Sequence, residues 1–301
     1  MAKGQRKKSY SGVSPDIYYK VIQGKLLIEG YKPDGNSIRF QANNTKAFDN
    51  LYRAHKLRLS PRDHSVQLRF ETADALEYHY AGHKQPGGEE ARDYLLSLVG
   101  FDNIQYEKDT VKSSEPHSVP ATILTNSLDP FGRPISYLLI DEQAKKIKDS
   151  SVIPVDDQML YTTLNINLLS NGFAYHLLYT STPFPHREYV RKIASTARNL
   201  GKGVWKHDQT SMYKLEDFAS IEEVAIYPKL FRRSVDYLKT KEKGFEGDLA
   251  DWLRSYKNGA EDDLVLIAER YGPVHLSDLL EQYNNQVVLK ADLLELVFEE
   301  R

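Results

Sequence analysis

The chain has 301 residues, with 40 Lys and Arg against 42 Asp and Glu, nine His and no Cys. This length is enough for about two domains, and the lack of cysteine excludes a disulfide scaffold, thiol catalysis and thiolate metal sites. No apolar run approaches the roughly 20 residues of a membrane-spanning helix, and no signal-peptide pattern follows the first residues, so we expect a cytoplasmic protein without a membrane partner.

The charge is unevenly distributed along the chain. Residues 261–301 contain ten acids and three bases, a net charge of −7 within a total of −2, which leaves +5 for residues 1–260. The bases gather at 3–8 and at 187–206. A basic body with an acidic end is compatible with an anionic partner, although solvated charged faces are the simpler interpretation.

The N-terminal part begins with a segment that we expect to be a basic flexible tail, residues 1–16. Two strand-like runs, 17–31 and 37–41, flank the turn-forming residues 32–36 (Lys-Pro-Asp-Gly-Asn). This arrangement predicts a hairpin. The polar stretch 43–64 that follows is interpreted as an insertion.

The next strand is predicted from alternation. Val66, Leu68 and Phe70 are apolar and separated by polar residues, which places Arg69 on the opposite face. Residues 88–99 have helical spacing and acids in the first turn, and a glycine follows. The later elements are predicted as strands over 103–108, 121–126 and 135–140, a helix over 164–171, a strand over 173–179 and a basic helix over 186–200.

Beyond residue 206 the composition shifts from strand-rich to helix-rich patterns. We predict helices over 220–238, 247–257, 263–271, 277–283 and 291–300. The apolar residues at helical spacing there indicate a small bundle or a partner-binding surface (Leu279, Leu280, Val287, Leu293, Leu294 and Val297). The acidic helices are a candidate protein-binding element, and inert packing is the simpler alternative.

Three polar clusters lie at predicted strand ends or turns: Asp34-Gly35-Asn36, Arg69 with Asp74 and Glu77, and Phe131-Gly132-Arg133. Phosphodiester cleavage passes through a highly anionic phosphorane. It requires guanidinium donors for the phosphoryl oxygens, a carboxylate for water and often an oxygen-ligated cation. Each cluster alone is also typical of an ordinary surface arginine or turn.

The order and spacing of these clusters resemble the staphylococcal nuclease (thermonuclease) family. In that family a strand arginine is followed five residues later by a metal-ligand aspartate and eight residues later by a glutamate, as in Arg69, Asp74 and Glu77. The family's Asp-Gly-Asp-Thr turn is similar to residues 34–37, and its Tyr-Gly-Arg is similar to 131–133. The resemblance covers residues 17–206, with insertions at 43–64 and about 102–118.

The resemblance implies an α+β fold: an OB-type Greek-key β-barrel with packed helices over 17–206, followed by a mainly helical region over 207–301. It also implies a metal-dependent endonuclease that hydrolyses DNA or RNA. By position, Arg69 and Arg133 would bind the phosphate, and Glu77 would act as general base or orient water. The cation, Ca²⁺ or else Mg²⁺ or another divalent ion, would be held by Asp74, Asn36 and the carbonyl of Ala75.

Several positions depart from the family pattern. Asn36 stands where the family has aspartate, which removes one negative charge from the cation site. Leu76 replaces a proline, and Tyr179 lies one position away from a nucleotide-contacting tyrosine. The alternative function is therefore a nucleic-acid- or protein-binding module with weakened or lost catalysis.

Four further features have both functional and structural interpretations. Phe131 and Tyr179 are candidates for stacking on a base, and Arg187 and Arg191 for contacting the nucleic-acid backbone. The alternative for the two arginines is a solvated helix face. His79 and His83 have the spacing of zinc ligands on a helix, but their Gly/Pro-rich surroundings favour a loop pair without a metal. Glu71 lies on the same strand face as Arg69, as an orienting partner or as a surface ion pair of little consequence.

Overall fold

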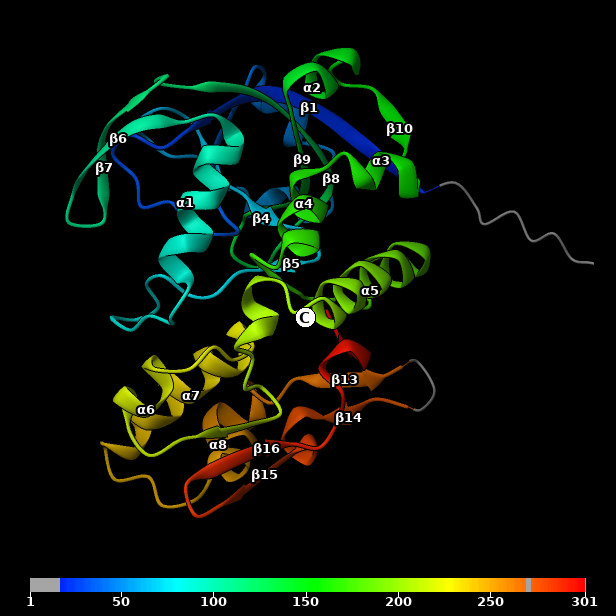
Figure 1. Ribbon diagram of the computed structural model, residues 1–301. Coiled ribbons are helices and arrows are strands. Elements are labelled where there is room, and N and C mark those ends of the chain that lie inside the picture. Colours follow the sequence, from blue (N-terminus) through cyan, green and yellow to red (C-terminus); the bar gives the residue numbers. More distant parts are fainter. Residues whose placement is uncertain (1–16, 269–271, 301) are drawn as a thin grey trace, which may run out of the picture.

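The computed structural model describes residues 17–268 and 272–300, so the predicted N-terminal tail lies outside the described residues. Figure 1 shows two lobes: an N-terminal lobe, residues 17–206, and a C-terminal lobe, residues 207–300. Within the described residues, no helix is both long and apolar enough to cross a membrane.

The N-terminal lobe is built on one strongly curved sheet that nearly closes into a barrel. The strand order is β3-β2-β1-β8-β9-β4, with β10 paired to β1. Neighbouring strands are antiparallel except for the parallel pair β4–β9. The strands are β1 (Tyr18–Leu27), β2 (Arg39–Ala42), β3 (Val66–Gln67), β4 (Arg69–Phe70), β8 (Val119–Leu128), β9 (Pro134–Ile140) and β10 (Val152–Pro154).

The predicted elements of this lobe are largely confirmed. The first hairpin forms between β1 and β2, and Val66, Leu68 and Phe70 are buried. Gly24 allows the two backbones to approach closely, because a Cβ there would lie 2.2 Å from the carbonyl oxygen of Gln41. The result is a mixed α+β fold with a barrel-like sheet.

Helices and short strands surround the barrel. The helices are α1 (Gly88–Val99), α2 (Asp141–Lys146), α3 (Asp157–Tyr161), α4 (Leu164–Asn171) and α5 (Phe184–Asn199). The predicted strand over 173–179 shortens to β11 (Tyr175–His176), which pairs with β5 (Ala73–Asp74). The two predicted insertions hold the 3₁₀ turns η1 (Thr45–Phe48) and η2 (Ala54–Lys56), and the hairpin of β6 (Asp102–Glu107) and β7 (Thr110–Glu115). The turn η3 (Gly203–Lys206) leads into the C-terminal lobe.

The C-terminal lobe is mixed, which corrects the prediction of a mainly helical region. Its helices are α6 (Phe218–Glu222), α7 (Pro228–Lys241) and α8 (Leu249–Ser255). Its strands form two small sheets, β12-β16-β15 and β14-β13-β17. They are β12 (Met212–Lys214), β13 (Leu264–Ile267), β14 (Val274–His275), β15 (Leu280–Tyr283), β16 (Gln286–Leu289) and β17 (Leu296–Phe298), interspersed with η4 (Tyr256–Gly259), η5 (Leu276–Leu279) and η6 (Leu293–Glu295).

The helices predicted over 263–271, 277–283 and 291–300 are therefore wrong as far as the described residues extend; 269–271 lie outside them. The dipeptide Asn284-Asn285 explains part of the error, because both residues have positive φ, 47° and 61°, and join β15 to β16 in a tight hairpin. Apolar segments this short satisfy helical and strand periodicity equally well. The six apolar residues named for this region are buried, so they are core residues rather than an exposed partner-binding surface. Five of them lie in the core of the C-terminal lobe, and Val297 packs into the core of the barrel lobe.

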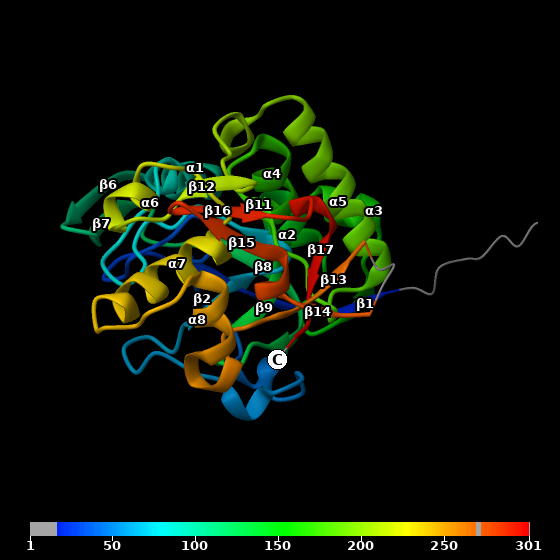
Figure 2. The same ribbon diagram turned by 90° about the horizontal axis from the view of Figure 1, so that it is seen from below.

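The two lobes are in direct contact (Figure 1), and the view from below in Figure 2 has the C-terminal lobe in front of the barrel lobe. The final strand β17 returns to the N-terminal lobe, where the amide of Phe298 donates to the carbonyl of Leu178 and the amide of Thr180 donates to the carbonyl of Phe298, each at 2.8 Å. Gln85 joins the lobes through a 2.7 Å hydrogen bond from its Nε2 to the carbonyl of Ile226. Side chains of α7 are consequently held next to the barrel.

A buried histidine at this interface leads to a prediction about stability. Burial lowers the pKa of the His176 imidazole to about 4. The carbonyl oxygen of Leu293, 3.1 Å from Nε2, opposes this shift because it favours the protonated ring. Because this pKa lies below that of an unfolded histidine, about 6.5, the unfolded chain takes up a proton first as the pH falls. The contribution of neutral His176 to the free energy of unfolding is complete above about pH 6.5 and decreases toward pH 4. The total decrease is at most about 3 kcal/mol.

The measurement is urea unfolding between pH 7.5 and 4.5 for the wild type and His176→Gln. The substitution is expected to flatten the decline of the unfolding free energy in this window, because glutamine does not titrate. Equal slopes for the two proteins would contradict the assignment.

Candidate active site

The predicted catalytic residues line one pocket of about 840 Å³ at the junction of the lobes. Seven of the ten site residues named from the sequence line it: Asn36, Arg69, Asp74, Glu77, Phe131, Arg133 and Tyr179. The C-terminal lobe contributes the rest of the wall, including Lys229, Arg232 and Arg233 from α7. The predicted residues thus meet in space, and they meet a second set that the sequence did not indicate.

Arg69 is positioned by β4, whose parallel pairing with β9 sets the side chain on the face opposite Phe70. Its guanidinium carbon lies 4.7 Å from the centre of the Tyr179 ring. Within residues 17–268 and 272–300, no carboxylate forms an ion pair with Arg69 and no acceptor hydrogen-bonds to it. Its donors are therefore available to a ligand in the pocket.

Arg133 is held at one side only. Its Nε donates to Oδ2 of the buried Asp129 at 2.6 Å, and the same carboxylate accepts the Arg133 amide through Oδ1 at 2.9 Å. In the described part of the chain, neither terminal nitrogen makes a hydrogen bond. Gly132 allows this tight turn, because its φ is +85° and a Cβ would lie 2.0 Å from the carbonyl oxygen of Lys56.

Glu77 lies in the loop after β5 and is nearly buried. Its backbone is fixed by Gln85, which accepts the Glu77 amide at 3.1 Å and donates its own amide to the Glu77 carbonyl at 2.8 Å. Burial raises the pKa of the Glu77 carboxyl to about 7, although Arg232 opposes this shift. Only Oε1 accepts from Arg232; among the described residues Oε2 has no donor and is available to a water molecule.

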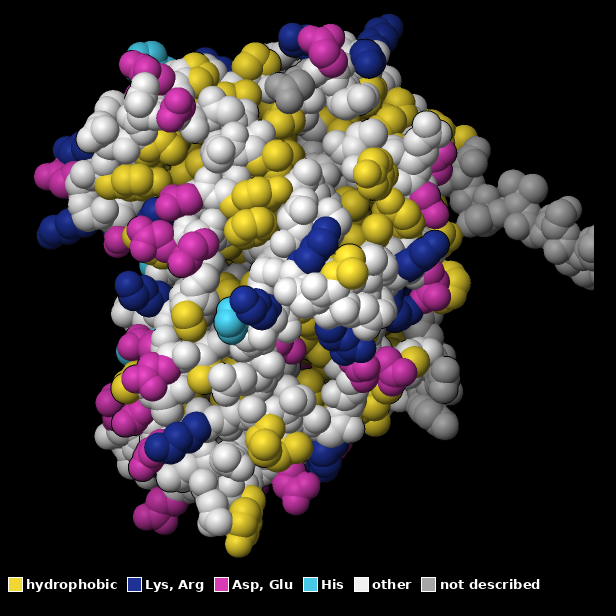
Figure 3. Space-filling view, in the orientation of Figure 1, with side chains coloured by type: hydrophobic (Ala, Val, Ile, Leu, Met, Phe, Trp, Pro, Cys, Tyr) yellow, Lys and Arg dark blue, Asp and Glu magenta, His cyan; other side chains and the backbone are white. Residues whose placement is uncertain are grey.

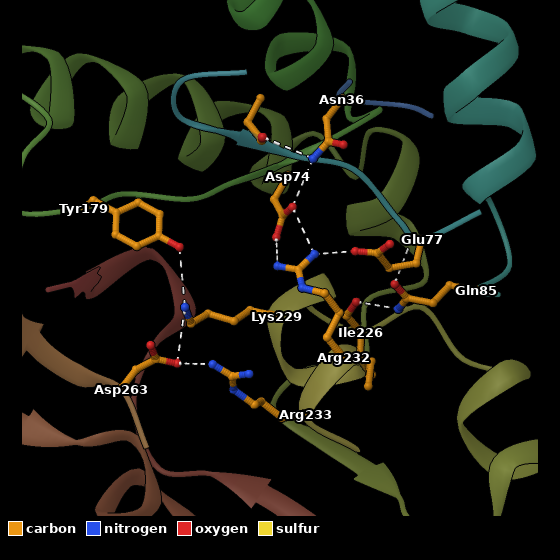
Figure 4. A network of polar contacts seen from close by, with 11 residues as sticks. Asn36, Asp74, Glu77, Gln85, Tyr179, Ile226, Lys229, Arg232, Arg233 and Asp263 are labelled. Carbon is orange, nitrogen blue, oxygen red and sulfur yellow. Dashed lines mark hydrogen bonds and ion pairs between the residues drawn. The ribbon is translucent and has the colours of Figure 1, made fainter. Parts of the chain in front are cut away.

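Asp74 is buried and has several partners (Figure 4). Arg232 donates to it through both terminal nitrogens, at 3.3 Å to Oδ1 and 2.9 Å to Oδ2. Asn36 donates from Nδ2 to Oδ1 at 3.0 Å. Asp34 lines the pocket beside them, and burial raises the pKa of its carboxyl.

The residues of the implied cation site do not fit a divalent ion in this arrangement. Both oxygens of Asp74 accept N–H donors, Asn36 presents its amide nitrogen, and the Arg232 guanidinium lies between Asp74 and Glu77. Ala75 is buried beside them. Among the described residues, no group of three or more His, Asp or Glu could hold a metal ion. The implied calcium site therefore stays a prediction that this geometry does not support.

Helix α7 supplies the pocket residues that sequence reasoning missed. Lys229 binds Asp263 at 3.2 Å and lies 3.4 Å from the hydroxyl of Tyr179, while Arg233 binds Glu261 and Asp263. Arg232 contacts the two carboxylates of the barrel loop. The available signal was a cluster of three cations at 229–233 on an amphipathic helix, which by itself indicates only a charged helix face.

The remaining candidates are dispersed. Phe131 is 67% exposed at the pocket rim, in a position compatible with stacking. Arg187 and Arg191 lie on α5 outside the pocket lining, and Arg191 donates to the carbonyl of Leu294 at 2.9 Å. Glu71 accepts from the hydroxyl of Thr182 at 2.6 Å and makes no ion pair with Arg69 among the described residues.

The two histidines of the HxxxH pattern, His79 and His83, contact different partners. His83 lies 2.8 Å from a carboxylate oxygen of Glu222 and stacks on Phe218 with ring centres 4.1 Å apart. His79 contacts Tyr78, with ring centres 5.4 Å apart. The segment between them forms a tight turn rather than a helix.

The charge of the pocket wall is mixed. The acidic end of the chain contributes Glu261, Asp263, Glu299 and Glu300, and most cations of the wall pair with acids. Figure 3 likewise shows Lys and Arg interspersed with Asp and Glu on the face drawn. Arg69 and Arg133 are consequently the donors best placed to meet an anion, which suits one phosphodiester better than a long polyanionic track.

Neither a protein-family model nor a curated protein matches this chain.

Proposed function

We propose that this protein is a phosphodiester hydrolase of the staphylococcal nuclease type, acting on DNA or RNA. One observation carries the proposal: Arg69, Arg133 and Glu77 line the same pocket, and each has polar atoms without a partner among the described residues. Two guanidinium groups can stabilise the charge on the phosphoryl oxygens, and one carboxylate can activate the attacking water.

The chemistry follows from these atoms. Arg69 and the terminal nitrogens of Arg133 hold the phosphoryl oxygens and offset the charge that develops in the phosphorane. A water oxygen attacks phosphorus while Oε2 of Glu77 takes a proton from that water. The P–O bond to the leaving alkoxide then breaks, and the alkoxide takes a proton from solvent. The exposed ring of Phe131 is placed to stack on a neighbouring base.

A binding module without catalysis is the second candidate. The blocked cation site favours it, because both oxygens of Asp74 accept N–H donors from Arg232 and Asn36 and leave no ligand set for the implied metal. Such a module would retain a labelled oligonucleotide without cleaving it.

The test is cleavage of end-labelled single-stranded DNA and RNA by the full chain, with EDTA, Ca²⁺ or Mg²⁺. We expect turnover, and Arg133→Met is expected to lower the rate about 100-fold, because it removes one set of charge-stabilising donors. Arg62→Met, which changes an exposed arginine outside the pocket, is the matched control.

Binding without turnover under every condition would favour the second candidate. Equal rates for Arg133→Met and Arg62→Met would exclude the proposed catalytic set.

A further inference from the structure

The C-terminal lobe places a guanidinium between two barrel carboxylates (Figure 4). Arg232 donates to both oxygens of Asp74 and to Oε1 of Glu77. A planar fork with several donors matches two carboxylates in a way that a single ammonium group does not. The side chain thus bridges the last residue of β5 and the loop that follows it.

The electrostatics of the pocket favour a cation between Asp74 and Glu77. Asp74 and Glu77 are both nearly buried, Asp34 lies nearby, and buried carboxylates are costly unless they are paired. Asn36 adds a donor and no charge. Arg232 supplies the opposite charge from within the chain.

The position of Arg232 is held by packing on both sides. It lies on α7, where Phe231 and Val235 are buried in the core of the C-terminal lobe. The adjacent Arg233 binds Glu261 and Asp263. Gln85 ties the Glu77 loop to Ile226, just before α7 begins. The Arg232 guanidinium is therefore held in a fixed position in the pocket wall.

We propose that Arg232 is the resident cation of this site and a positioning residue for hydrolysis, taking the place of a divalent metal. It holds Oε1 of Glu77 and leaves Oε2 for the attacking water. This inference rests on the proposed phosphodiester hydrolysis and changes its requirements, because cleavage then proceeds without an added metal ion.

The first experiment measures single-turnover cleavage in EDTA by the full chain, Arg232→Met, Arg232→Ala and Arg232→Lys. The wild type is expected to retain its rate in EDTA within about twofold. Arg232→Met is expected to lose about 100-fold, because Glu77 loses its orientation and charge partner. Arg232→Lys should recover only part of this loss, because one ammonium cannot bridge both carboxylates as well.

Lys239→Met is the matched control, because Lys239 is on the same helix and also contacts the barrel lobe, donating to the carbonyl of Ala81 at 2.6 Å, but does not line the pocket. Adding guanidinium ion at low millimolar concentration to Arg232→Ala is expected to restore cleavage at least tenfold. A purely structural arginine would show no such rescue. Circular dichroism and thermal unfolding establish that each variant is folded.

A second readout does not depend on activity. Calorimetric titration with Ca²⁺ alone is expected to show no binding by the wild type and binding by Arg232→Ala, in which Asp74 and Glu77 are released. Wild-type binding of Ca²⁺, or a wild type that cleaves only with a divalent ion, would overturn the inference while leaving the hydrolase proposal intact.

An Arg232→Met variant that cleaves as fast as or faster than the wild type would also overturn it. Absence of cleavage by all variants under all conditions would instead refute the proposed function.

Discussion

Replacing Arg69 with alanine is expected to lower the single-turnover rate of phosphodiester cleavage about 1,000-fold. Among the described residues this guanidinium has no ion-pair partner, and it faces the pocket from a two-residue strand beside the Tyr179 ring. Its N–H donors can therefore bind the phosphorane without first breaking an ion pair within the protein. The loss should fall mainly on the chemical step, because the charge on the phosphoryl oxygens is greatest in the transition state.

The variant Arg69→Lys distinguishes the effect of the positive charge from the effect of the donor geometry of arginine. A lysine keeps the positive charge but not the two parallel donors, so we expect it to recover part of the lost rate and most of the substrate affinity. Rates and oligonucleotide dissociation constants are measured for both variants and for Arg62→Ala. A loss of affinity with an unchanged chemical step would show that Arg69 only binds substrate.

The barrel was predictable because its signals are local. Alternation at Val66, Leu68 and Phe70 identified the inner face of the strand and thereby the direction of Arg69. Gly100, the glycine that follows the helix predicted over 88–99, has positive φ and ends α1, and Gly172 ends α4 in the same way. Three pocket residues, Arg69, Asp74 and Glu77, come from one short segment, so their proximity needed little tertiary information.

The C-terminal lobe was less predictable for a physical reason. Its strands are two to four residues long, and segments of this length carry too few periods to distinguish a strand from a helix. The turn at Asn284-Asn285 was the most direct signal of a hairpin, since asparagine tolerates positive φ better than most residues.

No pattern in the sequence indicated that Arg232 would contact the carboxylates of the barrel. It is 158 residues from Asp74 and 155 from Glu77, and its partners are set by how the two lobes pack against each other. Charge arithmetic along the chain separates a basic region from an acidic end. It does not reveal that acids of the C-terminal end and arginines of the barrel line one pocket.

Glu77→Gln is expected to lower the cleavage rate about 1,000-fold, because an amide cannot accept the proton of the attacking water. The substitution is close to isosteric. The amide oxygen can still accept from Arg232, and Asp74 continues to hold that guanidinium. The loss can then be attributed to proton transfer rather than to a collapsed site.

Glu71→Gln provides the matched control for this variant. Glu71 is a second carboxylate whose pKa is raised by burial, but it faces Thr182 and does not line the 840 Å³ pocket. Single-turnover rates of both variants are compared with the wild type, together with their thermal unfolding midpoints. If Glu77→Gln keeps more than about a tenth of the wild-type rate, Glu77 orients the water without acting as its base, since general bases typically contribute about 100-fold or more.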